Sequence, residues 1–99
     1  MINALLIAVR HQNNPDFETE VEETVQLIEA CEMTHVMTVI QGMEEKNVAT
    51  YFKSGKLQEL QTHIEAQKID VIVTQDELSP SQHRNLTEIL EAEIIDRTH

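Results

Sequence analysis

The feature that most constrains the fold is an uninterrupted aliphatic run near the start of the chain. Residues 3–10 read Asn-Ala-Leu-Leu-Ile-Ala-Val-Arg, with no polar side chain between the two ends. A strand with one solvent-facing side would alternate apolar and polar residues, so this run indicates a strand that is buried on both faces of a parallel sheet. It is far shorter than the ~20 apolar residues that span a membrane, so no membrane association is expected. The rest of the chain must supply helices for both faces.

Three further strands are predicted downstream of this run. Residues 35–41 are rich in β-branched side chains, while residues 70–74 and 93–97 are short apolar segments. The polar stretch 42–50 has no periodicity and is predicted to be a loop.

Three helices are predicted between these strands. Residues 16–32 carry apolar side chains at helical spacing, with glutamates on the opposite side. A second helix begins at Ser54. A third begins at Ser79-Pro80, where a serine N-cap precedes a proline at the first helical position, and it ends near Glu91.

The resulting β-α-β-α-β-α-β order predicts an α/β fold with a four-stranded parallel sheet and right-handed crossovers. The first and third strands are the most apolar and are expected in the centre, which gives the strand order 2-1-3-4. The first helix would then lie alone on one face. Since one helix cannot cover four strands, we expect another segment or a second copy of the chain to complete that face.

Composition limits the possible partners. The chain has 99 residues, enough for one domain over residues 1–99, and a net charge of −11, which argues against a dedicated nucleic-acid binder. The single cysteine, Cys31, excludes an internal disulfide, fits a reducing cytoplasm and is expected to be a buried, inert thiol on the first helix. The five histidines lack the close spacing of zinc ligands, so no metal site is predicted.

No catalytic residue is predicted. Gly55-Lys56 lacks the upstream glycine and the following Ser or Thr of a nucleotide triphosphate loop, because Leu57 follows the lysine. What remains is a helix N-terminus beside a lysine, which fits either simple helix initiation or a generic anion site. Asp76 and Glu77 follow the third strand, but they have no evident base, nucleophile or metal partner.

Charge is distributed unevenly along the chain. The segments expected at the carboxyl ends of the strands carry a net charge of −1, and the rest of the chain carries −10. Ligands of open α/β sheets usually bind at the carboxyl edge, so an anionic partner would be met there. An equally good explanation is that loops hold fewer of the helix-favouring glutamates. The segments counted are residues 10–18, 41–56, 74–84 and 96–99.

Three stretches resemble a known family. Residues 49–60 read Ala-Thr-Tyr-Phe-Lys-Ser-Gly-Lys-Leu-Gln-Glu-Leu, residues 76–86 read Asp-Glu-Leu-Ser-Pro-Ser-Gln-His-Arg-Asn-Leu, and residues 95–98 read Ile-Asp-Arg-Thr. In order and spacing they are similar to the N-terminal domain of the HflX family of ribosome-associated GTPases. The chain departs from the family pattern at Lys53, which replaces the first glycine of Gly-x-Gly-Lys and puts a side chain where a phosphate would approach.

The resemblance implies a domain that precedes a helical hairpin and a GTPase domain. The whole protein would bind the large ribosomal subunit and split or rescue stalled ribosomes, and ATP binding and RNA-related activity have been attributed to its N-terminal region. GTP and Mg²⁺ would bind in the GTPase domain. The present chain stops where the helical region should begin, so it is expected to need no cofactor and to hydrolyse no GTP itself.

Three functions follow as hypotheses. The first is a non-catalytic accessory domain that positions or regulates an HflX-like GTPase on the large ribosomal subunit and contacts its own helical and GTPase domains. The second is a small nucleotide- or phosphate-binding module at the start of the second helix. The third is a self-association domain that forms a homodimer. The residues predicted to face an anion or RNA are Lys53, Ser54, Gly55, Lys56, Arg84, Asn85 and Arg97.

Overall fold

The computed structural model describes residues 1–10, 14–42, 46–47 and 51–96. All four predicted strands and all three predicted helices are present, together with a short hairpin. In chain order the elements are β1 (Ile2–Arg10), α1 (Phe17–Ala30), β2 (Met33–Gly42), β3 (Lys46–Asn47), β4 (Tyr51–Phe52), α2 (Ser54–Gln67), β5 (Val71–Thr74), α3 (Pro80–Leu90) and β6 (Glu93–Asp96).

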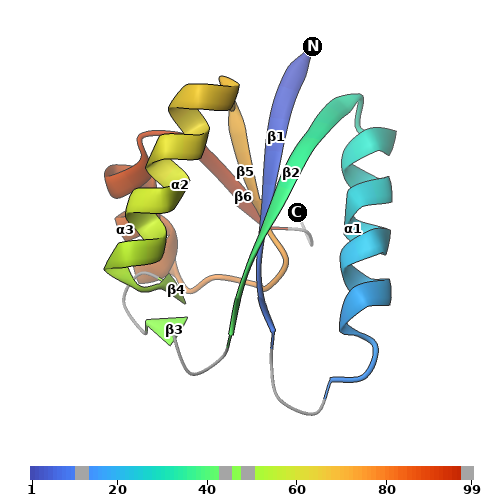
Figure 1. The fold of residues 1–99 in the computed structure, drawn as a ribbon, viewed down its shortest axis with the longest axis horizontal. Coiled ribbons are helices and arrows are strands. Elements are labelled where there is room, and N and C mark those ends of the chain that lie inside the picture. Colours follow the sequence, from blue (N-terminus) through green and yellow to red (C-terminus); the bar gives the residue numbers. More distant parts are fainter. Residues whose placement is uncertain (11–13, 43–45, 48–50, 97–99) are drawn as a thin grey trace.

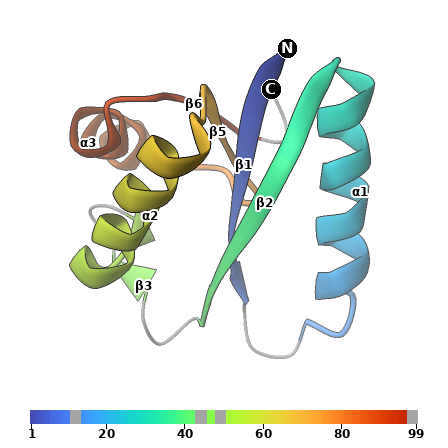
Figure 2. The ribbon, with the colours of Figure 1, turned by 45° about the horizontal axis from the view of Figure 1, so that its top comes forward.

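The main sheet has four parallel strands in the order β2-β1-β5-β6. This confirms the predicted α/β fold and the predicted strand order. The register places Ala4 of β1 beside Val71 of β5, and Val71 beside Glu93 of β6. Helix α1 lies on one face of the sheet, while α2 and α3 lie on the other (Figure 1, Figure 2), as expected for right-handed crossovers.

Strand β1 divides the core into two halves. Residues 4–9 are each no more than 1% exposed, which confirms burial on both faces. Because successive side chains of a strand point to opposite faces, they alternate between the two halves. The half beside α2 and α3 contains Leu5, Ile7, Val9, Phe52, Leu60, Ile72, Leu86 and Ile94. The half beside α1 is smaller and contains Ala4, Leu6, Ile28, Val71 and Val73.

The three helices begin and end differently. At the start of α3, Ser79 Oγ accepts a hydrogen bond from the backbone N–H of Gln82 at 3.1 Å, and the N–H of Ser79 donates to Gln82 Oε1 at 3.0 Å. This capping box, with Pro80 at the first helical position, confirms the predicted start. Helices α2 and α3 end at Lys68 and Glu91, whose φ values of 53° and 51° are left-handed although neither is glycine. None of the helices in the described part of the chain is long and apolar enough to cross a membrane.

The apolar side of α1 differs from the prediction. Cys31 is exposed, because the helix ends at Ala30 and leaves the cysteine at the C-cap. Instead, Thr24 is only 1% exposed, and its hydroxyl lies 2.7 Å from Oε1 of Gln75, which follows β5. The predicted burial of Cys31 was therefore wrong, and a polar pair between α1 and the loop after β5 occupies the interface.

The stretch 42–50 was predicted to be a loop, but part of it belongs to a hairpin. Strand β3 pairs with β4 in antiparallel orientation, with Lys46 aligned to Phe52. Each strand has only two residues, too few to show the alternation that identifies a strand in sequence. The hairpin leads directly into α2.

Candidate anion-binding site

Four of the predicted site residues meet at the carboxyl edge of the sheet. Helix α3 follows the carboxyl end of β5, and α2 follows the separate β3–β4 hairpin, which comes after the carboxyl end of β2 (Figure 1). An open pocket of about 370 Å³ lies beside the first turn of α2. Its lining residues are Gln41, Lys53, Ser54, Gly55, Lys56 and Glu59.

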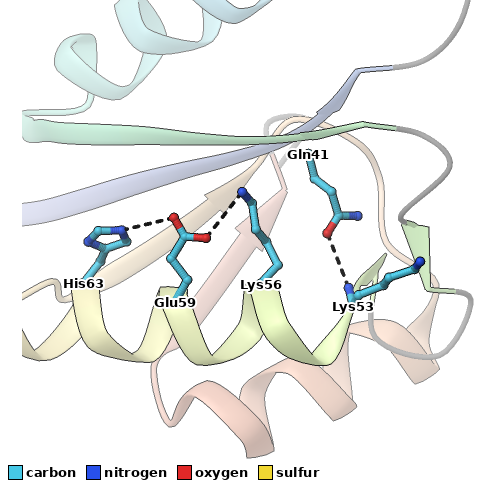
Figure 3. A network of polar contacts seen from close by, with 5 residues as sticks. All are labelled: Gln41, Lys53, Lys56, Glu59 and His63. Carbon is cyan, nitrogen blue, oxygen red and sulfur yellow. Dashed lines mark hydrogen bonds and ion pairs between the residues drawn. The ribbon is translucent and has the colours of Figure 1, made fainter.

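Gln41 is the pocket residue that sequence analysis missed. It lies near the end of β2 and is only 2% exposed. Its side chain reaches toward the start of α2, where Oε1 accepts a hydrogen bond of 3.4 Å from the backbone N–H of Lys53 (Figure 3). The amide nitrogen Nε2 has no hydrogen-bond partner among the residues that the structure describes. Rotating the carboxamide by half a turn would place a donor against the Lys53 N–H, so the orientation is fixed and the NH₂ group is left over.

A short row of ionisable side chains runs along α2 from the pocket. Lys56 Nζ lies 3.3 Å from Glu59 Oε2, and His63 Nε2 lies 3.6 Å from Glu59 Oε1 (Figure 3). These pairs are three and four residues apart, the spacings that bring helical side chains together. Glu59 is about half exposed, so the pairs contribute little to stability. Their effect is on charge, because Glu59 offsets one of the two lysines and leaves the pocket lining with one net positive charge.

The remaining predicted site residues do not join this pocket. Arg84 is exposed and Asn85 is half-buried, and both lie on α3. Arg97 falls outside the described residues. The pocket at α2 therefore contains four of the predicted site residues, and Arg84 and Asn85 lie apart from it on α3.

Arg10, also at this edge, is paired with other side chains of the domain. Its guanidinium lies 2.7 Å from Glu18 Oε1 and 4.5 Å from the centre of the Phe17 ring. The hydrogen bond from Arg10 lowers the pKa of the Glu18 carboxyl. Arg10 is thus not an open cation for a ligand.

Asp96 connects two of the stretches on which the family resemblance rests. Its Oδ2 accepts a hydrogen bond of 3.3 Å from the N–H of Leu78, and its Oδ1 lies 3.1 Å from the hydroxyl of Thr74. The same hydroxyl lies 2.8 Å from the carbonyl oxygen of Asp76. The end of β6 thereby holds the loop between β5 and α3, a contact that the sequence does not reveal because its partners are 18 and 22 residues apart.

The described residues offer no candidate metal centre beside this pocket. They contain no group of three or more His, Cys, Asp or Glu side chains that could hold a metal ion. Asp76 is half-buried and Glu77 is exposed in the loop after β5. The pocket at α2 offers hydrogen-bond donors and positive charge, which suit the binding of an acceptor group.

The sequence of this chain is similar to those of one family of known proteins. Residues 18–99 match the family described as GTP-binding GTPase N-terminal. The chain is 34% identical over 94 residues to a GTPase HflX of Lacrimispora saccharolytica, covering 95% of this chain and 22% of that protein. It is 31% identical over 96 residues to a GTPase HflX of Caldanaerobacter subterraneus subsp. tengcongensis, covering 97% of this chain and 22% of that protein.

Solved structures agree on the fold. A crystal structure of SsGBP in complex with GDP aligns with a TM-score of 0.70 at 23% identity, over 98% of this chain and 26% of that chain. The chain spans less than a quarter of the HflX relatives described above and is similar to one part of them.

Proposed function

Since this chain belongs to the GTP-binding GTPase N-terminal family, we propose that it is the non-catalytic accessory domain of an HflX-like GTPase and positions or regulates that protein on the large ribosomal subunit. The observation that carries the proposal is the similarity to proteins named GTPase HflX over 95% of the chain. The role on the ribosome is what the family resemblance implies. GTP hydrolysis, with its GTP and Mg²⁺, is assigned to the part of the longer relatives that this chain does not cover.

The distribution of charge supports an approach to RNA through one edge only. Helix α1 carries five glutamates and no basic residue, so its exposed side repels the phosphates of ribosomal RNA. Lys53 and Lys56 lie at the start of α2, at the carboxyl edge, and Arg84 lies in the second turn of α3. A nearly neutral edge on an otherwise acidic domain orients it, because only that edge approaches a polyanion without strong repulsion.

Cosedimentation with purified large ribosomal subunits tests this proposal. The full-length GTPase that carries this domain is compared with a variant that combines Lys56→Glu and Arg84→Glu. Reversing two charges at the contacting edge should weaken binding by about tenfold or more, with a shallower dependence on salt concentration. Lys68→Glu, at the opposite end of α2, is the control for a single reversal and is compared with Lys56→Glu and Arg84→Glu made one at a time, since each of these changes alters the net charge by −2. Binding by the double variant equal to that of the control would refute the assignment of the edge.

A second candidate function, self-association, is favoured by the groove beside α1. A groove of about 50 Å³ opens between α1 and strands β5 and β6, with Leu27, Cys31 and Ile95 among its lining residues. Leu27 is 48% exposed although it belongs to this apolar wall. Pairing with a second copy would bury that surface. Light scattering across a wide range of concentrations tests it: a dimer that Leu27→Gln dissociates supports the idea, and a constant monomer mass rejects it.

A further inference from the structure

We propose that Gln41 and the first turn of α2 form a binding site for a single phosphate group, with a preference for the singly charged phosphodiester of an RNA backbone. The inference rests on the geometry of the pocket and does not require the role on the ribosome. A nucleotide could present the same chemical group, and the experiments below distinguish the two sources.

The first step is the unpaired amide of Gln41. The side chain is 2% exposed, and its Nε2 has no hydrogen-bond partner among the described residues. Buried donors are almost always paired, because leaving one unpaired forfeits its interaction with water. Gln41 lines the pocket at α2, so an acceptor oxygen placed in that pocket would complete its hydrogen bonding.

The second step is the uncapped start of α2. The first intrahelical hydrogen bond that reaches back to the N-cap runs from the N–H of Leu57 to the carbonyl oxygen of Lys53, at 3.0 Å. The preceding N–H groups, those of residues 54–56, have no acceptor within the helix. Lys53 occupies the N-cap and supplies no side-chain hydrogen bond there, whereas α3 is capped by Ser79. Backbone donors and the positive end of the helix dipole therefore face the same pocket as Gln41.

The third step is charge. Lys53 and Lys56 line the pocket, and Glu59 lies 3.3 Å from Lys56 and also lines it. The lining therefore has one net positive charge and a carboxylate close by. A phosphodiester carries one negative charge and matches this lining, while the second charge of a phosphate monoester would be repelled by Glu59. Lys53 fills the position that glycine holds in the family pattern, so a side chain that carries an ammonium group replaces close backbone approach at this point.

The test follows the amide signals of the 99-residue chain by NMR during titration with dimethyl phosphate, inorganic phosphate, AMP and a single-stranded RNA hexamer. Binding should shift the Gln41 side-chain NH₂ and the backbone amides of residues 54–56 together. Dimethyl phosphate should bind more tightly than inorganic phosphate at neutral pH. If the RNA hexamer binds at least tenfold more tightly than AMP, the source is an RNA backbone. The reverse order would identify a nucleotide and reject the phosphodiester preference.

Gln41→Met removes the Nε2 donor, together with the Oε1 acceptor of the Lys53 N–H, while nearly preserving length and shape, and it should weaken the binding of dimethyl phosphate by about three- to tenfold. Gln67→Met, the same change at the exposed end of α2, should leave it unchanged. Should Gln41→Met unfold the domain, Lys53→Gln provides the second variant, with a comparable loss expected. Failure of residues 54–56 to shift at ~100 mM dimethyl phosphate would overturn the proposal, as would equal affinity in both methionine variants. The ribosome assay uses Lys56 and Arg84, so either proposal can fail while the other stands.

Discussion

Asp96 should hold the loop before α3 in place, and removing its carboxylate should destabilise the domain. The N–H of Leu78 donates to Asp96 Oδ2, and Leu78 itself is only 8% exposed. A hydrogen bond to a charged acceptor contributes roughly 1.5–3 kcal/mol, and this range includes the cost of leaving the Leu78 donor unpaired. Thr74 loses less, because its hydroxyl keeps the carbonyl oxygen of Asp76.

Together these terms predict that Asp96→Ala lowers the free energy of unfolding by about 2 kcal/mol, since the 3.3 Å bond and the half-buried carboxylate place it in the lower part of that range. For a domain of this size, that corresponds to a fall in Tm of roughly 8–16 °C. Asp96→Asn should lose less, because its carbonyl oxygen can still accept from the Leu78 N–H while its NH₂ group donates to the Thr74 hydroxyl oxygen, so that mainly the charge is lost.

Urea denaturation measures the change, and hydrogen exchange of the Leu78 amide locates it. Glu93→Gln, an exposed position at the other end of β6, serves as the control and should remain within about 0.5 kcal/mol of the parent. If both Asp96 variants match this control, the carboxylate does not hold the loop and the reasoning fails.

Three further predictions follow from the remaining features. Glu91→Gly should raise the free energy of unfolding by about 1 kcal/mol, because glycine adopts the left-handed φ of 51° without strain. Glu88→Gly, within α3, is the control and should lower the free energy of unfolding by a similar amount. The Tm values of the two variants, measured by thermal unfolding, test the prediction. Arg10 lowers the pKa of the Glu18 carboxyl in the folded state. Their pair therefore stabilises the fold fully at pH values above the pKa of Glu18 in the unfolded chain, and this stabilisation is lost as the pH falls through the lower pKa of the folded state. The free energy of unfolding of Glu18→Gln should therefore fall less on acidification than that of the parent. Equal falls, measured by urea denaturation at a series of pH values, would contradict the pairing. Leu6→Ala should cost about 2–5 kcal/mol, since Leu6 is 0% exposed; a loss below 1 kcal/mol in urea denaturation would show that β1 is not buried on both faces.

The general fold could be predicted because its strongest signals are local. The aliphatic run of β1 has few alternatives, and Ser79-Pro80 marks a helix start by its own chemistry. The strand order followed from which runs were most apolar, combined with the handedness of crossovers. These features depend on a few adjacent residues or on a general rule of chain geometry.

The predictions that failed depend on the exact end of an element or on distant partners. Cys31 fell outside the buried surface because α1 ended at Ala30, two residues before the predicted end of the helix. The buried Thr24 has its partner 51 residues away. Gln41 appeared to be only a polar residue at the end of a strand, and nothing in sequence indicates that its NH₂ group would be buried without a partner. The predicted roles of Arg84, Asn85 and Arg97 at the carboxyl edge stay predictions.

The position of β1 has a consequence for incomplete chains. This strand precedes the other described elements in the sequence, yet one of its two neighbours, β5, begins only at Val71. A product truncated before that residue would keep β1 paired on the side of β2 and would present its opposite backbone edge, flanked by aliphatic side chains, to any other extended polypeptide. Nascent or clipped fragments of this domain should thus aggregate or be degraded, and solubility should appear abruptly once the chain extends past β5.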